Sequence, residues 1–173
     1  MTKTRTIAFV SLMTAVIIIC SFIQIPATIP FTLQTMGIFL ALKLLGGYRG
    51  TVSILTYILL GGIGLPVFSG FKGGISAITG PTGGYIVGFL LMGILYLCFE
   101  KHLNNKLKEN LCLIAGLAIC YAFGTLWFTY LMNGKFTLKS AFLTCVAPFI
   151  IFDLGKLILA EIIATRVKSN LKL

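Results

Sequence analysis

The sequence has few charged residues, and very few of them are acidic. Only 10% of its 173 residues are charged and four are Asp or Glu, whereas 58% are hydrophobic. An average soluble domain carries about 25% charged residues, and so few charges cannot cover the surface of a soluble globule of this size. The composition therefore excludes an ordinary cytosolic domain, and the apolar excess also excludes a disordered or collagen-like chain. We expect lipid to surround this chain.

Sequence motifs of catalysis and of metal binding are also missing. His102 is the only histidine, and the sequence contains no HExxH, no GxSxG and no pair of catalytic carboxylates. Gly155-Lys156 lacks the upstream glycine and the following Ser or Thr of a phosphate-binding loop. The five cysteines form no CxxC pair and lie in or beside apolar runs, where cysteine behaves as a small hydrophobe. We therefore predict no enzyme activity, no metal site and no ATPase within this chain.

The basic excess has a topological explanation. The chain has 14 Lys and Arg residues and a net charge of +10, which in a soluble protein would suggest a nucleic-acid partner. Here no basic stripe is interleaved with aromatic residues, and the charges fall mainly between apolar runs. This pattern excludes nucleic-acid binding and favours basic loops that stay in the cytoplasm.

Apolar runs between glycine, proline and charged residues predict an all-α integral membrane protein, a single domain over residues 1–173. A spanning helix needs about 20 apolar residues, so six helices would use about 120 and leave about 50 for tails and loops. The remainder is too short for a soluble catalytic domain. The second run is short and contains Lys43, and the third is interrupted by glycines and Pro66. The predicted bundle of six transmembrane helices covers approximately residues 6–25, 32–45, 51–67, 83–99, 110–132 and 140–165.

The first apolar run could also be a signal peptide, because Lys3 and Arg5 precede it. The run from Ile7 to Ile25 is long for the apolar core of a signal peptide, and no small-x-small cleavage site closes it. We therefore interpret it as the first membrane helix, with a signal peptide as the alternative.

The distribution of Lys and Arg predicts the orientation of the helices. With the N-terminus inside, ten of these residues fall on the inner side and three on the outer side, and Lys156 lies within a span. Positive loops stay in the cytoplasm, so both termini are expected there. The inner set is Lys3, Arg5, Lys43, Arg49, Lys101, Lys106, Lys108, Arg166, Lys168 and Lys172, and the outer set is Lys72, Lys135 and Lys139.

The last span contains the feature that points most directly to a site. Asp153 and Lys156 are three residues apart and therefore project from one face of a helix. Each ionisable group near the centre of a bilayer costs about 2.5–3.5 kcal/mol, and as a pair they are neutral. Pro148 is expected to loosen the backbone a turn before them. The pair indicates a ligand or ion path, with a salt bridge that only fixes helix packing as the alternative.

Two further segments are candidates for ligand contact. Residues 64–85 are rich in glycine and lie outside in the predicted topology, where bare backbone approaches a ligand closely. Phe68, Thr82 and Tyr85 add an apolar face and hydroxyls to this segment, although Gly84-x-x-x-Gly88 within the next span is equally typical of helix packing. The third candidate is Gln34-Thr35, two polar residues at the outer end of the second span, with helix-end residues that face water as the alternative.

Four motifs in this order resemble the BioY family. They are Phe31-Thr-Leu-Gln-Thr35, the stretch GGIGLPVF at 61–68, the stretch GPTGGY at 80–85, and Asp153-x-x-Lys156. Their order and spacing are similar to those of biotin-specific substrate-binding (S) components of energy-coupling factor (ECF) transporters, and the resemblance covers nearly the whole chain.

The resemblance implies a six-helix protein in the cell membrane of a prokaryote that captures biotin with high affinity from the outer side. The implied partners are a transmembrane coupling subunit and two cytoplasmic ATPase subunits, which alone use ATP, and no cofactor is expected in this chain. S components usually carry Ala-x-x-x-Ala on the first helix against the coupling subunit, and Ser11-x-x-x-Ala15 is the nearest match here.

For the binding site, the resemblance implies that Asp153 and Lys156 contact the ligand. Asp153 would accept a hydrogen bond from a ureido N–H of biotin, and Lys156 would donate to the ureido oxygen or hold the pair in register. Hydroxyls and backbone N–H groups are left for the carboxylated tail. The glycine-rich region would form part of the pocket and its outer cover, through Gly70, Gly73, Gly74, Gly80, Thr82, Gly83 and Tyr85.

A different class of function remains as the alternative. Asp153 and Lys156 could gate a stand-alone carrier or channel for small solutes or protons, which would need neither ATP nor partner subunits.

Overall fold

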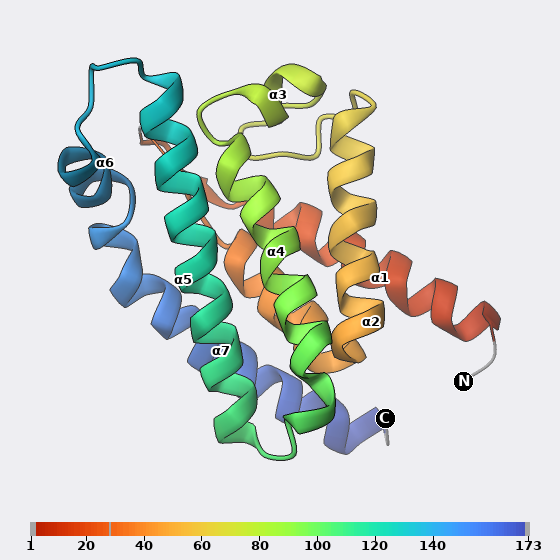
Figure 1. Ribbon diagram of the computed structural model, residues 1–173. Helices are drawn as coiled ribbons and strands as arrows, with labels where there is room; N and C mark the ends of the chain where they lie inside the picture. Colours follow the sequence, from red (N-terminus) through yellow and green to blue (C-terminus); the bar gives the residue numbers. More distant parts are fainter. Residues whose placement is uncertain (1–2, 28, 172–173) are drawn as a thin grey trace.

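The computed structural model describes residues 3–27 and 29–171, so Lys172, one of the basic residues assigned to the inner side, lies outside the described residues. Within this range the chain is a bundle of long helices with one small hairpin of two-residue strands (Figure 1). The elements in chain order are α1 (Lys3–Phe22), β1 (Gln24–Ile25), β2 (Phe31–Thr32), α2 (Gln34–Gly62), α3 (Ile75–Thr79), α4 (Gly83–Phe99), a 3₁₀ turn η1 (Glu100–His102), α5 (Lys106–Leu131), α6 (Leu138–Cys145) and α7 (Ala147–Leu171).

Helix α2 is bent sharply at Gly46. This residue has φ 79° and ψ −179°, a backbone conformation that is essentially restricted to glycine. The carboxylate of Glu100, at the end of α4, accepts a hydrogen bond from the Gly47 N–H over 2.7 Å. A Cβ atom on Gly46 would collide with the same carboxylate. The bend therefore depends on glycine at this position and is held by one partly buried contact with an acidic side chain.

The bend turns α2 into two legs, residues 34–45 and 47–62, which run back along each other in Figure 1. Gly50 of the second leg lies directly against Ala41 and Leu42 of the first. In the described range, five helical stretches are long and apolar enough to cross a membrane, and α2 contributes two legs to the bundle. The predicted fold class, an all-α membrane bundle of six helices, is confirmed, with the two legs of α2 as its second and third helices.

The end of the chain differs from the single helix expected over 140–165. Helix α6 ends before Val146, whose φ and ψ are −127° and −53°, and α7 starts at Ala147. Pro148 lies in the first turn of α7, where a missing N–H removes no helical hydrogen bond. The proline therefore begins the helix that carries Asp153 and Lys156, and the break in the backbone lies two residues before it.

Helices α4 and α5 approach each other closely because glycines face the partner helix. Gly84 of α4 lies against Trp127 and Gly88 against Cys120, so a Cβ atom at either position would collide with α5. Gly116 of α5 lies in the same way against Met92. The small-residue pattern of Gly84 and Gly88 is therefore explained by helix packing.

The two ends of the bundle differ in chemistry. We call the end that carries residues 24–32 and 64–82 the cavity end, and the end that carries residues 46–49 and 100–108 the basic end. Both the first and the last described residues lie toward the basic end in Figure 1.

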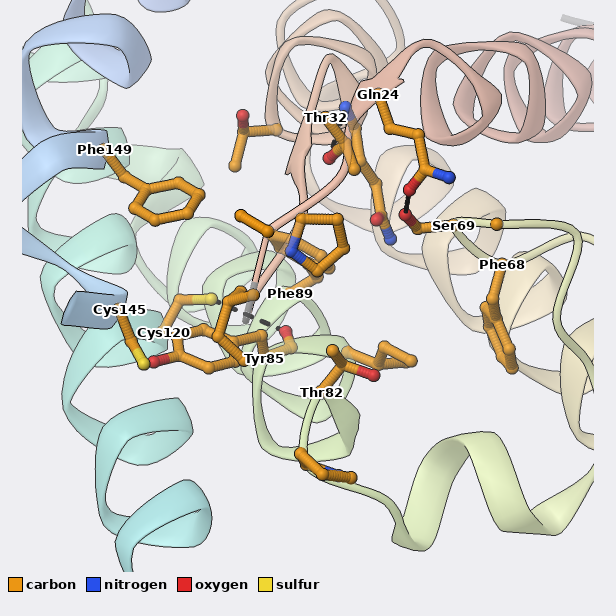
Figure 2. A pocket seen from close by; sticks show the side chains of 18 of the residues that line it. Gln24, Thr32, Phe68, Ser69, Thr82, Tyr85, Phe89, Cys120, Cys145 and Phe149 are labelled. Atoms are coloured by element: carbon orange, nitrogen blue, oxygen red, sulfur yellow. Dashed lines mark hydrogen bonds between the residues drawn. The ribbon is translucent and has the colours of Figure 1, made fainter. Parts of the chain in front are cut away.

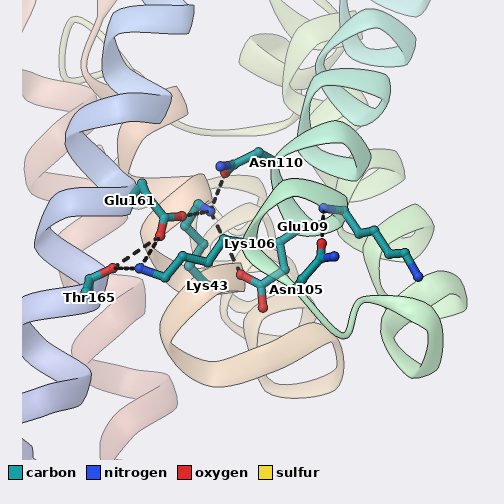
Figure 3. A network of polar contacts seen from close by, with 8 residues as sticks. Lys43, Asn105, Lys106, Glu109, Asn110, Glu161 and Thr165 are labelled. Atoms are coloured by element: carbon teal, nitrogen blue, oxygen red, sulfur yellow. Dashed lines mark hydrogen bonds and ion pairs between the residues drawn. The ribbon is translucent and has the colours of Figure 1, made fainter.

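At the basic end, a buried lysine ties three helices together (Figure 3). Lys43 of α2 is 2% exposed, and its ammonium donates to Asn110 Oδ1 of α5 and to Glu161 Oε2 of α7, both over 2.6 Å. Glu161 also pairs with Lys106 over 3.2 Å, and Glu109 lies 4.0 Å from Lys43. Lys43 is thus a buried, compensated charge rather than an exposed loop cation.

We predict that Gly46→Ala destabilises the protein, because alanine would be strained by about 1–3 kcal/mol in this backbone conformation. The apparent Tm of the detergent-solubilised protein should fall. Gly155→Ala is the matched control, because Gly155 is helical and nothing lies within 4 Å of an added Cβ. That control should leave the Tm unchanged or raise it, and an equal loss in both variants would contradict the assigned bend.

Candidate functional site

A cavity of about 300 Å³ lies inside the cavity end of the bundle (Figure 2). Its walls come from the hairpin of β1 and β2, the first turn of α2, the segment 68–82, and helices α4, α5 and α7. Segments that are more than a hundred residues apart in the sequence therefore face the same space. The volume is at the lower end of the range that small-molecule sites occupy, about 300–1,000 Å³.

The polar centre of the cavity is the pair predicted from the sequence. Lys156 Nζ lies 2.6 Å from Asp153 Oδ1, and both side chains are buried, at 9% and 2% exposure. Thr35 of α2 donates its hydroxyl to Asp153 Oδ1 over 2.8 Å, and Tyr121 of α5 donates to Asp153 Oδ2. The carboxylate is thus held by groups from three helices, and its charge is compensated within the protein.

The hydrogen-bonding capacity of this pair is unequally used. Lys156 donates to three acceptors, namely Asp153 Oδ1, the Thr32 carbonyl over 2.6 Å and the Thr35 hydroxyl over 3.2 Å. An ammonium group has three N–H donors, so Lys156 has none left for a ligand. Asp153 accepts three hydrogen bonds, whereas a carboxylate has about four acceptor positions. The remaining position, on Oδ2, is able to accept from a ligand N–H.

Aromatic side chains supply part of the other walls of the cavity. Phe149 lies one turn before Asp153 on α7 and stacks on Phe31, with ring centroids 3.8 Å apart. Tyr85 and Phe89 of α4 line the neighbouring wall, and the Tyr85 hydroxyl lies 3.3 Å from Thr125 Oγ1. Flat apolar faces next to one polar centre suit a ligand with a compact ring that carries hydrogen-bonding groups.

The segment 64–82 covers the cavity and is attached to the bundle by neutral contacts. Ser69 donates a hydrogen bond to the Gln24 side chain of β1, and Phe71 stacks on Phe22 with ring centroids 4.5 Å apart. At the far end of the segment, the Trp127 indole of α5 donates to the Gly80 carbonyl over 3.0 Å. No charged group takes part in these contacts.

Most of the predicted binding residues meet at the cavity, and four glycines do not line it. Gly73 packs against the Leu65 carbonyl and Gly83 against the Ile78 carbonyl, so both glycines permit close backbone contacts that shape the cover. The residues at the cavity are Gln34, Thr35, Phe68, Gly70, Thr82, Tyr85, Asp153 and Lys156, and those outside its lining are Gly73, Gly74, Gly80 and Gly83. Their roles in ligand binding stay predictions.

The predicted partner contact lies elsewhere. Ser11 and Ala15 are both exposed on α1, away from the cavity lining. A small-residue face that its own bundle leaves uncovered is accessible to a helix of another subunit, and this role also stays a prediction.

Sequence reasoning missed several residues of the cavity. Tyr121 had a usable signal, because a hydroxyl inside an apolar run has to find a polar partner. Phe89 and Phe149 had none, since 14 phenylalanines in an apolar chain face lipid or protein without any difference in sequence. The other missed residues include Gln24, Thr32, Ser69, Lys72, Cys120 and Cys145.

Comparison with known proteins gives consistent matches along the full length of the chain. A family model described as the BioY family matches residues 1–173. The chain is 40% identical to the biotin transporter BioY of Thermotoga maritima, over 90% of this chain and 91% of the relative. It is 36% identical to the probable biotin transporter BioY of Pyrococcus horikoshii, over 97% and 99% of the two chains.

Among solved structures, the chain is similar to the crystal structure of the S-component for biotin from an ECF-type ABC transporter. The TM-score is 0.87 at 32% sequence identity, and the match covers 98% of this chain and 95% of that chain. The likeness therefore extends over the whole bundle.

We predict that Lys156→Met destabilises the protein more than the double variant Asp153→Asn/Lys156→Met. The single variant leaves a buried carboxylate without its cation, which costs about 3–5 kcal/mol, whereas the double variant removes both charges. Thermal unfolding in detergent measures the difference. Lys168→Met, an exposed lysine on the same helix, is the control and should not change the Tm. If the Tm of the double variant fell by the sum of the losses in the two single variants, the two residues would not be coupled.

Proposed function

This chain belongs to the BioY family, and we propose that it is the substrate-binding component of an ECF-type ABC importer and captures biotin. The proposal is supported by full-length relatives that are biotin transporters and by the likeness to an S-component for biotin. The observation that carries it in this chain is the Asp153–Lys156 pair, buried in the wall of a covered cavity that aromatic side chains help to line. Transport, rather than catalysis, agrees with the missing enzyme motifs.

The hydrogen-bonding groups of biotin match the acceptor position that the Asp153–Lys156 pair leaves free. Biotin has a ureido group with two N–H donors, an apolar thiophane ring and a carboxylated tail. A ureido N–H donates to Asp153 Oδ2, which keeps one acceptor position. Lys156 holds the carboxylate in place, because its own three donors are already used. The ring lies against the faces of Phe149, Tyr85 and Phe89.

The energy for transport comes from partner subunits. The chain carries no phosphate-binding loop, so a transmembrane coupling subunit and two cytoplasmic ATPases bind it and use the ATP, and this chain needs no cofactor. Ser11 and Ala15 form the contact with the coupling subunit, on the exposed face of α1.

The protein lies in the cell membrane of a prokaryote, and the cavity end faces outward. The prokaryotic membrane setting agrees with relatives from bacteria and an archaeon. Outward orientation is supported by the cluster of basic residues at the opposite end, near which both described ends of the chain lie. The cover over residues 64–82 is then the part that biotin meets first.

We predict that the purified, detergent-solubilised chain binds biotin tightly without partners. Asp153→Asn should weaken binding by about 10- to 100-fold, because a hydrogen bond to a charged group contributes about 1.5–3 kcal/mol. Lys156→Ala should weaken binding by a similar factor, because it removes the ammonium group that holds the Asp153 carboxylate in place. Isothermal titration calorimetry measures the affinity, and Gly155→Ala on the same helix should bind like the wild type.

The possible outcomes separate the function from the site. Unchanged affinity in both variants would contradict the site, and no binding by the wild type would contradict the function. Flux of a solute or of protons in liposomes, without ATP or partners, would instead support the stand-alone carrier or channel.

We also predict that Ser11→Leu/Ala15→Leu prevents co-purification with the co-expressed coupling subunit and ATPases, because the larger side chains keep the helices apart. Biotin affinity of the isolated variant should not change, since neither residue lines the cavity. Ala118→Leu, at an exposed small residue of α5, is the matched control and should co-purify normally. Normal assembly of the α1 variant would contradict the assigned contact.

A further inference from the structure

A second lysine lines the cavity, and it belongs to the cover. Lys72 lies in a narrow hairpin in which its N–H and C=O bond to the backbone of Phe68, over 3.3 and 2.9 Å. Ser69 and Phe149 lie on opposite sides of the cavity in Figure 2, so this hairpin faces the α7 wall that carries Asp153 and Lys156. The hairpin fixes the backbone of Lys72, which lines the cavity and is exposed.

Within the part of the chain that the structure describes, the charge of Lys72 has no counterion. Of the four acidic residues, Glu100 accepts from the bend of α2 and Glu109 and Glu161 lie beside Lys43, all toward the basic end. Asp153 is bonded to Lys156. Within the described residues, no hydrogen bond or ion pair engages the Lys72 ammonium. A cation at a covered cavity with no nearby carboxylate favours an anionic group in the ligand.

Lys156 does not fit this role. Its charge is neutralised by Asp153 and its three N–H donors are used within the protein, so it offers an incoming carboxylate neither net charge nor a donor. The hydroxyls of Thr82 and Tyr85 offer donors but no charge.

We propose that Lys72 binds the carboxylate of the ligand, and that the cavity is divided into a urea end at Asp153 and an acid end at Lys72. This inference rests on the proposed function, since it assigns the two ends of biotin within the same cavity. It also gives the cover a direct contact with the ligand: the ion pair forms only when the hairpin 68–72 lies over the cavity. The tail carboxylate therefore stabilises the closed cover, and a ligand without that charge loses this contribution.

The test compares biotin with biotinamide, whose tail is neutral and otherwise of the same shape. Wild type should bind biotin about tenfold more tightly than the amide, as expected for one charge-assisted contact. Lys72→Gln should weaken biotin binding by about the same factor and leave the affinity for the amide unchanged, and Lys72→Arg should restore the preference. Lys135→Gln, an exposed lysine outside the cavity lining, is the control and should behave like the wild type.

Raising the salt concentration provides a second measure. Affinity for biotin should fall with ionic strength in the wild type and not in Lys72→Gln, because salt screens a partly exposed ion pair. If wild type binds both ligands equally, or if Lys72→Gln weakens both equally, the carboxylate assignment is overturned and the proposed function stands. If wild type binds neither ligand, the proposed function itself fails.

Discussion

The ion pair between Asp153 and Lys156 is the constraint around which this bundle is built. A single charge in an apolar bundle is costly, and the cost falls only when a partner of opposite charge and further hydrogen bonds are supplied. Here the partner is three residues along the same helix, and Thr35 and Tyr121 bring α2 and α5 to the same carboxylate. Satisfying one buried charge therefore fixes the relative positions of three helices and creates the polar centre of the cavity.

The structure shows what the few acidic residues of the chain contact. Glu100 holds the bend at Gly46, Glu161 neutralises the buried Lys43, and Asp153 neutralises Lys156. Each of these carboxylates makes a specific contact between separate segments or within the site, and none of them lies on the cover. The cover over residues 64–82 is left with neutral contacts and one cation, Lys72. The distribution of four acidic residues thus separates a bundle that charged contacts hold together from a cover that neutral contacts hold in place and that carries positive charge.

The features that could be predicted from the sequence are those with a composition that is unusual for an apolar chain. Asp153 and Lys156 stood out because charges inside an apolar run are costly, and the cover stood out because glycine is concentrated there. Phe89 and Phe149 were not found, because their role depends on which way α4 and α7 are rotated, and apolar helices in lipid carry little periodicity that fixes this rotation. The break at Val146 was missed because Pro148 was expected to loosen a continuous helix, whereas it lies in the first turn of a new one. Lys72 was counted only as an outer charge. Local composition indicates where a helix or a loop lies, whereas three-dimensional packing determines which of its residues face the cavity.

The spacing of the polar layers indicates which part of the molecule can move. Thr35 and Lys43 lie eight residues apart on α2, and their partners Asp153 and Glu161 lie eight residues apart on α7. The first leg of α2 and α7 therefore run in the same direction and are joined at two levels about 12 Å apart. Separating them would expose charge at both levels at once, so the two helices behave as one rigid unit from the cavity to the basic end. Opening the cavity is then expected at the cover, whose contacts with the bundle are neutral, such as the Ser21 hydroxyl on the Val67 carbonyl and Phe68 against Tyr57. A ligand whose acid end pairs with Lys72 adds to the cover the charged contact that the protein itself does not supply.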